Sequence, residues 1–258
     1  MSGAAIGLRG ISARYEGAEQ LAVDGVDLAV APGEFIALVG PSGSGKSTLL
    51  RTVNRLVPIE HGRIELDGID TATLDPVVLR RGIGYAIQAV GLFSHMDVAT
   101  NIAIVPSLLG WDRARITARI DEMLELVRLD PAQYRHRRPS ELSGGEAQRV
   151  GVARALAASP RALLMDEPFG ALDAIVRHVL QRELHEIVRS AGTTTLFVTH
   201  DVNESLLLAD RIAVMRGGRI EQCASPLEVL AHPANDYVRE LFAADDAVAR
   251  IREQARRL

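Results

Sequence analysis

The feature that most constrains the fold of this chain is the glycine-rich segment Gly40-Pro-Ser-Gly-Ser-Gly-Lys46-Ser47. It follows the apolar run FIALV at 35–39, and helical spacing of apolar residues begins near Lys46. Glycines allow the backbone to curl so that successive N–H groups point inward at an anion, and the helix that follows adds its positive N-terminal end. A chance glycine-rich turn would not need this strand and helix on either side. The segment therefore predicts an α/β fold with a nucleoside triphosphate site.

The side chains of this phosphate loop (residues 40–47) have separate predicted roles. Lys46 supplies a mobile positive charge for the β- and γ-phosphates, and Ser47 offers a hydroxyl to Mg²⁺. The other predicted nucleotide contacts are Gly40, Ser42, Gly43, Gly45 and Thr48.

A pair of adjacent carboxylates, Asp166 and Glu167, ends the apolar run ALLM at 162–165. Ligands of open α/β sheets bind at the carboxyl ends of strands. We expect Asp166 to hold Mg²⁺ through its water shell, and Glu167 to take a proton from an attacking water. By itself the pair could equally be a solvated strand end, but the phosphate loop upstream favours the functional interpretation.

The remaining pattern predicts one domain. Apolar strand-like runs alternate with helical stretches, which indicates a mostly parallel sheet buried on both faces. Short strands at 6–40 form the predicted N-terminal antiparallel β region, and the leucine- and isoleucine-rich segment at about 97–158 is a predicted helical insert. We expect a single domain over 6–240 and a basic helical tail over 241–258, carrying Arg250, Arg252, Arg256 and Arg257. A solvated helix face explains that tail better than contact with anionic lipid does.

Composition and charge exclude several classes of protein. A net charge of −4 and a pI near 6.0 argue against a general nucleic-acid binder. The single cysteine, Cys223, excludes an internal disulfide and is expected to be an inert thiol. No run approaches the roughly 18 to 20 apolar residues that span a bilayer, and no signal-peptide pattern begins the chain. We expect a cytoplasmic protein that reaches any membrane through a partner.

Residues 142–149, LSGGEAQR, resemble the signature motif of ATP-binding-cassette (ABC) proteins. The resemblance implies the ABC ATPase fold, with ATP and Mg²⁺ as cofactors. It also implies that Ser143, with the amides of Gly144 and Gly145, caps the γ-phosphate held by the opposite subunit. An ordinary helix N-cap is the alternative for this segment alone. The commonest family spelling has Gln where this chain has Glu146.

Other landmarks of the family follow in the expected order. Tyr15 resembles the aromatic residue that stacks on adenine, although a plain strand tyrosine is the alternative. Gln88 resembles the Q-loop glutamine that reports the γ-phosphate and Mg²⁺ to a transmembrane partner, and Gly170 to Asp173 resembles the D-loop. His200 matches the switch histidine and, with Glu167 and Gln88, completes the predicted catalytic set.

The resemblance also implies partners. ABC cassettes pair head to tail, so ATP would lie between Lys46 of one copy and Ser143 of a second copy. ATP would favour the closed dimer and hydrolysis would remove that preference. The helical insert would carry the movement to transmembrane permease subunits, which work with a substrate-binding protein, on the cytoplasmic face of the membrane.

Residues 84–111 closely resemble importers of quaternary-ammonium osmoprotectants such as glycine betaine, choline and carnitine, and residues 171–184 agree with that branch. Many members carry two regulatory CBS domains after the cassette, whereas this sequence stops at Leu258. Phosphate or amino-acid import is the alternative cargo. A soluble ABC ATPase of DNA repair, chromosome structure or translation is the alternative class, disfavoured by one cassette, one cysteine and no heptad run. A phosphate-loop kinase or GTPase would leave residues 142–149 and His200 unexplained.

Overall fold

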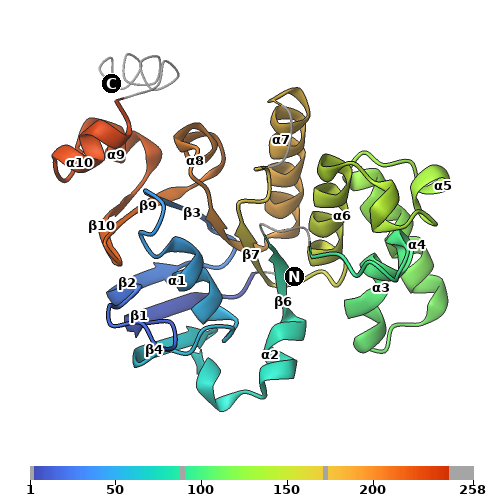
Figure 1. Cartoon of the computed structure of the whole chain (residues 1–258), viewed down its shortest axis with the longest axis horizontal. Helices are drawn as coiled ribbons and strands as arrows, with labels where there is room; N and C mark the ends of the chain where they lie inside the picture. Colours follow the sequence, from blue (N-terminus) through green and yellow to red (C-terminus); the bar gives the residue numbers. More distant parts are fainter. Residues whose placement is uncertain (1–2, 88–90, 171–173, 244–258) are drawn as a thin grey trace.

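The computed structural model describes residues 3–87, 91–170 and 174–243. Within them, strands and helices alternate around a central sheet, with a second sheet and a group of helices at opposite ends (Figure 1). No helix in these ranges is long and apolar enough to cross a membrane.

The central sheet has six strands in the order β10-β9-β3-β8-β7-β6. They are β3 (Phe35–Val39), β6 (Ile83–Ala86), β7 (Ala162–Asp166), β8 (Thr194–Val198), β9 (Arg211–Arg216) and β10 (Arg219–Ala224). Neighbours pair in parallel, except that β10 runs antiparallel to β9. Every residue of β3, β7 and β8 is buried, because this sheet is covered on both faces.

The second sheet is antiparallel, in the order β2-β1-β4-β5. Its strands are β1 (Ile6–Ala13), β2 (Val23–Val30), β4 (His61–Leu66) and β5 (Ile69–Asp70). In β2 buried residues alternate with more exposed ones, as expected of a strand with one face on the core. This sheet lies beside α1 (Lys46–Val53) (Figure 1), the helix that begins within the phosphate loop.

The helices fall into two groups. Those between β6 and β7 form the helical subdomain at one end of the molecule (Figure 1): α3 (Val98–Leu108), α4 (Arg113–Leu126), α5 (Pro131–Tyr134), the 3₁₀ turn η2 (Pro139–Glu141) and α6 (Gly144–Leu156). The others are η1 (Thr71–Thr73), α2 (Pro76–Gly82), α7 (Ala174–Ala191), α8 (Val202–Leu208), α9 (Pro226–Ala231) and α10 (Asp236–Leu241).

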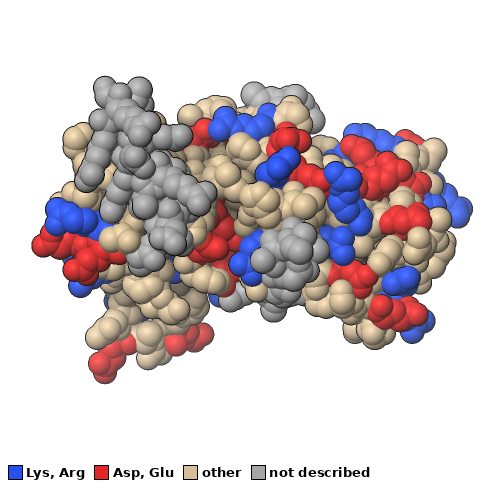
Figure 2. Space-filling model, turned by 90° about the horizontal axis from the view of Figure 1, so that it is seen from above, with Lys and Arg blue, Asp and Glu red and all other residues tan. Residues whose placement is uncertain are grey.

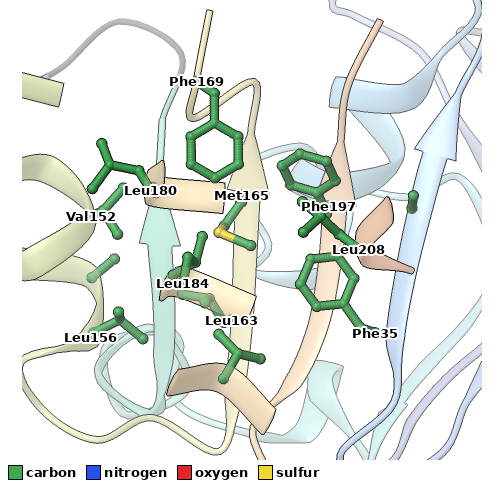
Figure 3. Close-up of a cluster of buried hydrophobic side chains, with 14 of the residues drawn as sticks. Phe35, Val152, Leu156, Leu163, Met165, Phe169, Leu180, Leu184, Phe197 and Leu208 are labelled. Carbon is green, nitrogen blue, oxygen red and sulfur yellow. The ribbon is translucent and has the colours of Figure 1, made fainter. Parts of the chain in front are cut away.

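The core divides into two clusters because side chains alternate across each strand. Leu163 and Met165 of β7 face one cluster, together with Phe35 and Phe197 of the neighbouring strands. There they meet α7 and α6 through Leu180, Leu184, Val152 and Leu156 (Figure 3). Ala162 and Leu164 face the other cluster, in which α1 packs between the two sheets. The strand carrying Asp166 and Glu167 is therefore fixed on both faces.

The predicted α/β fold, with a mostly parallel sheet, an N-terminal antiparallel region and a helical subdomain, is confirmed. Two strands, β5 and β10, were not predicted, since one is only Ile69–Asp70 and the other mixes exposed and half-buried residues at a sheet edge. The single-domain bounds 6–240 and the tail at 241–258 stay predictions, because residues 244–258 lie outside the described ranges.

Candidate functional site

The phosphate loop joins β3 to α1 and needs glycine at two close approaches. Gly40 has φ +147° and Gly45 has φ +99°. A Cβ at Gly40 would lie 2.1 Å from the carbonyl oxygen of Met215, and one at Gly45 would lie 2.2 Å from that of Ala22. A side chain at either position would displace backbone. The loop therefore curls tightly onto β9 and the segment before β2.

Lys46 lies inside this curl and is 6% exposed. Its ammonium donates to the carbonyl oxygen of Gly40 at 2.7 Å and to that of Pro41 at 3.0 Å. Burial lowers the pKa of Lys46, while the carboxylates of Glu167 and Asp166 oppose that shift. The Lys46 ammonium and the N-terminus of α1 thus lie close together, where both can bind a phosphate.

The buried carboxylate of Asp166 meets α1 at two side chains. The Ser47 hydroxyl donates to Asp166 Oδ1 at 2.7 Å, and Arg51 Nη2 donates to Oδ2 at 3.1 Å. Arg51 also donates from Nε to the Tyr85 hydroxyl at 3.3 Å, which connects α1 to β6. Asp166 is fully buried, and the Arg51 guanidinium compensates its charge.

Ser47 and Asp166 are suitable ligands for Mg²⁺. A hydroxyl and a carboxylate oxygen are the hard donors this ion prefers, and in phosphate sites it takes its other ligands from water and substrate. Within the described residues no group of three or more His, Cys, Asp or Glu could hold a metal ion. The hydroxyl of Ser47 and the carboxylate of Asp166 supply two hard donors, which fits a cation that takes its remaining ligands from water and a triphosphate.

Glu167, directly after β7, has a left-handed backbone with φ +49°. Three hydrogen bonds to the Glu167 backbone hold this conformation. Its amide donates to Val198 O at 3.0 Å. Its carbonyl oxygen accepts from Gly170 N at 3.2 Å and from the Gln148 side chain (Nε2) at 3.1 Å. Glu167 Oε2 lies 3.3 Å from Nδ1 of His200, which follows the end of β8.

Tyr15 lies at the rim of the same site. Its hydroxyl is 3.0 Å from Thr48 Oγ1 on α1, and the residue is 46% exposed. A ring with one anchored end and one open face can stack on a base.

Tyr15, the phosphate loop, Glu167 and His200 share one open pocket of about 620 Å³, whose lining does not include Asp166. Its lining consists of Tyr15, Ala22, Ser42, Gly43, Ser44, Gly45, Lys46, Ser47, Thr48, Glu167 and His200. The Lys46 ammonium and the loop amides thus share one pocket with Glu167 and His200, which suits a phosphate ester attacked by water.

The predicted signature residues lie elsewhere. Ser143 caps the N-terminus of α6, and Gly144 and Gly145 form its first turn. None of these three lines the phosphate-loop pocket. Within one copy, α6 belongs to the helical subdomain whereas α1 lies beside the antiparallel sheet (Figure 1). Gln88 and Asp173 lie outside the described residues.

Glu146, the variant residue of the signature segment, has a defined role in the cap. Its Oε2 accepts from Ser143 N at 2.7 Å, and its amide donates to Ser143 Oγ at 3.3 Å, which is a capping box. Its Oε1 accepts from the Tyr134 hydroxyl at 2.5 Å. That bond and the Ser143 backbone lower the pKa of Glu146 from 4.5 to about 2. The cap is therefore anionic at neutral pH.

Sequence reasoning missed several residues of this site. Arg51 carries a signal, because it lies four residues after Ser47 and so on the same face of α1. Tyr85 and Gln148 lie in segments that resemble the family, but their contacts with Arg51 and Glu167 arise from tertiary packing and carry no signal in the sequence.

The comparisons agree with this geometry. The ABC transporter family profile matches residues 23–170. This match covers more than half of the chain, and together with the relatives below it shows that the chain belongs to the ABC transporter family as a nucleotide-binding cassette.

Two relatives carry transport names. The osmoprotectant import ATP-binding protein OsmV of Salmonella typhimurium is 50% identical, over 89% of this chain and 60% of that protein. The glycine betaine/carnitine/choline transport ATP-binding protein OpuCA of Bacillus subtilis is 48% identical, over 92% of this chain and 62% of that protein. The chain thus spans about three fifths of the length of these relatives.

A solved structure of the ATP-binding cassette MJ0796, a dimer in a post-hydrolysis state bound to ADP and Pi, superposes with a TM-score of 0.78. It is 31% identical and covers 86% of this chain and 98% of that one. The likeness therefore includes the cassette as a whole.

Proposed function

We propose that this chain hydrolyses ATP to drive the import of quaternary-ammonium osmoprotectants through a membrane permease. The single observation that carries the hydrolytic part is the Glu167–His200 pair, which faces Lys46 and the phosphate loop across one pocket. A base, a partner that orients it and a phosphate cradle are the parts that phosphoryl transfer to water requires.

The chain's own residues divide the work as follows. The loop amides and Lys46 hold the β- and γ-phosphates, and Tyr15 stacks on the base. Glu167 accepts the proton of the attacking water, and His200 keeps the Glu167 carboxylate aimed at the γ-phosphate. Mg²⁺, held by Ser47 and Asp166, and by Gln88 as the family pattern implies, would neutralise charge that develops on the phosphate oxygens.

The position of Ser143 supports a dimer. The capped N-terminus of α6 offers a hydroxyl and free amides to an anion, yet it is not part of the pocket of its own chain. In a head-to-tail pair, each ATP would touch Lys46 of one copy and Ser143 to Gly145 of the other. The resemblance places Asp173 at the same interface.

A second hollow supports contact with a permease. It has a volume of about 310 Å³ and lies between β6, α2, α3 and α6. Apolar Ile83, Phe93 and Val105 line it, with Arg80 and Arg154 among its cations. It adjoins the segment after Gln88 and the helical subdomain, so a helix of a transmembrane partner bound there would sense both. Such binding would hold the chain at the cytoplasmic face of the membrane.

The cargo rests on the resemblance of residues 84–111 and on the relatives named above. Because residues 84–111 contribute to the second hollow, they indicate the type of permease that binds there. A permease of this type would work with a binding protein that recognises a quaternary ammonium group with aromatic side chains. The cassette itself does not touch the cargo.

The test is reconstitution of the complete transporter, with its permease and binding protein, in liposomes. ATP hydrolysis is measured with glycine betaine, choline, carnitine, phosphate or a neutral amino acid, for the wild type and for His200→Ala. We expect one of the first three to stimulate hydrolysis in the wild type only.

The possible outcomes separate the two parts of the proposal. Stimulation by phosphate or an amino acid alone would keep the ATPase and overturn the cargo. A wild-type complex without Mg²⁺-dependent hydrolysis would overturn the ATPase as well.

A further inference from the structure

Glu204, on α8, is a buried carboxylate that the proposed mechanism does not use. It is 6% exposed, and both of its oxygens are engaged by buried side chains. The Thr199 hydroxyl donates to Oε2 at 2.5 Å, and the Gln181 amide donates from Nε2 to Oε1 at 2.8 Å. Thr199 and Gln181 are themselves 2% and 5% exposed. Three polar groups from three segments thus form a closed network inside the core.

Thr199 connects this network to His200. While its hydroxyl donates to Glu204, the same oxygen accepts from Asp201 N at 3.0 Å. The backbone amide of Thr199 donates to Leu38 O of β3 at 3.2 Å. Both neighbours of His200 are therefore held in place. Thr199 is bonded to β3 through its backbone amide, and the Thr199 hydroxyl is bonded to both Glu204 and the backbone of Asp201. The aim of the His200 ring depends on this short segment.

Gln181 connects the network to α7, the helix that follows residues 171–173 and packs on the sheet through Leu180 and Leu184 (Figure 3). A displacement of α7 would move Gln181 and pull on Glu204. Because α8 begins directly after Asp201, the displacement would reach the His200 segment within a few residues.

The chemistry of the network calls for a carboxylate. Burial raises the pKa of Glu204, and the Thr199 and Gln181 bonds oppose that shift. Replacing Glu204 alone with an apolar residue would leave two buried donors without an acceptor, which is destabilising. The two converging donors therefore need two acceptor oxygens. Glutamine would turn one of those acceptors into an N–H donor that faces another donor.

We infer that Glu204 is a positioning residue for His200, tying the segment Thr199 to Asp201 to α7 so that His200 stays aimed at Glu167. The inference rests on the proposed hydrolysis by the Glu167–His200 pair. Glu204 is not among the residues that line the phosphate-loop pocket, so on this inference it acts on the chemistry through His200.

Two measurements on the purified full chain test this inference. The first needs no nucleotide: amide hydrogen exchange of the peptide containing residues 199–205 in Glu204→Gln, Thr199→Val and the control Glu186→Gln, an exposed carboxylate on α7. We expect faster exchange in the first two variants and wild-type exchange in the control, because only the first two break the network.

The second measurement is steady-state ATP hydrolysis with ATP affinity. We expect Glu204→Gln to lower kcat by about 10- to 100-fold with the Kd for ATP nearly unchanged, since misaligning a catalytic group costs turnover rather than binding. In a His200→Ala background the same substitution should have no further effect. Thr199→Val should behave likewise and serves if Glu204→Gln does not fold.

Each contrary result has one meaning. Wild-type turnover in Glu204→Gln, or a full additional loss in the His200→Ala background, would overturn the positioning role while leaving the ATPase intact. Unchanged amide hydrogen exchange in both network variants would contradict the inference that the network holds residues 199–201 in place. Absence of hydrolysis in the wild type, both as the purified chain and in the reconstituted transporter, would instead overturn the proposed function.

Discussion

At the scale of single residues, the site depends on how two adjacent carboxylates are kept apart. Asp166 ends β7 fully buried, bonded to Ser47 and Arg51, whereas Glu167 turns away through a positive φ and meets His200. One carboxylate is held in the protein and the other borders the pocket. On the proposed mechanism, this difference assigns the cation to Asp166 and the attacking water to Glu167.

Glu167→Gln keeps the shape of the side chain and removes the base. Turnover should fall by about 10²- to 10⁴-fold while ATP still binds. Because the γ-phosphate then persists, two copies should stay together. Light scattering with and without ATP–Mg²⁺ measures this, with the exposed Glu240→Gln as the control. A monomer in both conditions, with hydrolysis near the wild-type rate, would remove Glu167 from the mechanism.

Tyr15 offers a second test, which separates its ring from its hydroxyl. Tyr15→Ala should weaken ATP binding by roughly 1–3 kcal/mol, the range for stacking of a base on an aromatic ring. Tyr15→Phe keeps the ring and loses only the bond to Thr48, so it should cost at most about 1 kcal/mol. Titration with ATP provides the affinities. Equal affinity in Tyr15→Ala and the wild type would show that the base lies elsewhere.

At the scale of elements, the N-terminus of α6 is held in one geometry by the side chains around it. The capping box of Ser143 and Glu146 satisfies two backbone donors, and Tyr134 of α5 fixes the Glu146 carboxylate from the other side. The first turn of α6 is thus kept in place by two elements of the helical subdomain. Its exposed face remains available to a partner.

The depressed pKa of Glu146 has a consequence for stability. Since the folded-state pKa of about 2 lies below the ordinary 4.5, the contribution of this carboxylate is present above about pH 4.5 and is lost as pH falls toward 2. Glu146→Gln should lack this step, which urea unfolding at several pH values can measure. Tyr134→Phe removes the largest cause of the lowered Glu146 pKa. In this variant the acid-induced loss of stability should therefore occur closer to pH 4.5. Identical pH profiles for the wild type and both variants would contradict this role of the Tyr134–Glu146 hydrogen bond.

At the scale of the whole molecule, each copy holds its phosphate loop and its signature segment at different places. The described surface from above shows acidic and basic side chains interspersed over the helical subdomain (Figure 2). A head-to-tail pair is the arrangement that brings α6 of one copy to the pocket of the other. Each ATP site of such a pair would use residues from both copies, which can be tested by mixing two inactive variants.

Lys46→Ala and Ser143→Arg should each abolish most hydrolysis alone. In a mixed dimer, one site combines both substitutions and the other is intact. An equal mixture should therefore recover roughly a quarter of the wild-type rate if the two sites work independently. Titrating one variant into the other provides the measurement. A mixture no more active than its components would mean that the two residues do not serve a shared site.

Features built from contiguous residues could be predicted from the sequence, and features built from distant residues could not. The phosphate loop, the apolar strand before it and the strand that ends at Asp166 are contiguous patterns, and the structure has them where they were expected. The roles of the site residues stay predictions. The network of Gln181, Thr199 and Glu204 could not be predicted, because each residue looks ordinary in its own segment. Only packing of α7 and α8 against the sheet brings the three together.

The left-handed backbone at Glu167 has an evolutionary consequence. Glutamate costs about 1–2 kcal/mol there, whereas glycine or asparagine adopts that conformation more readily. Under selection for thermal stability alone, glycine or asparagine would therefore be favoured at this position. On the proposed mechanism, a glutamate here exchanges some stability of the fold for a carboxylate beside the pocket.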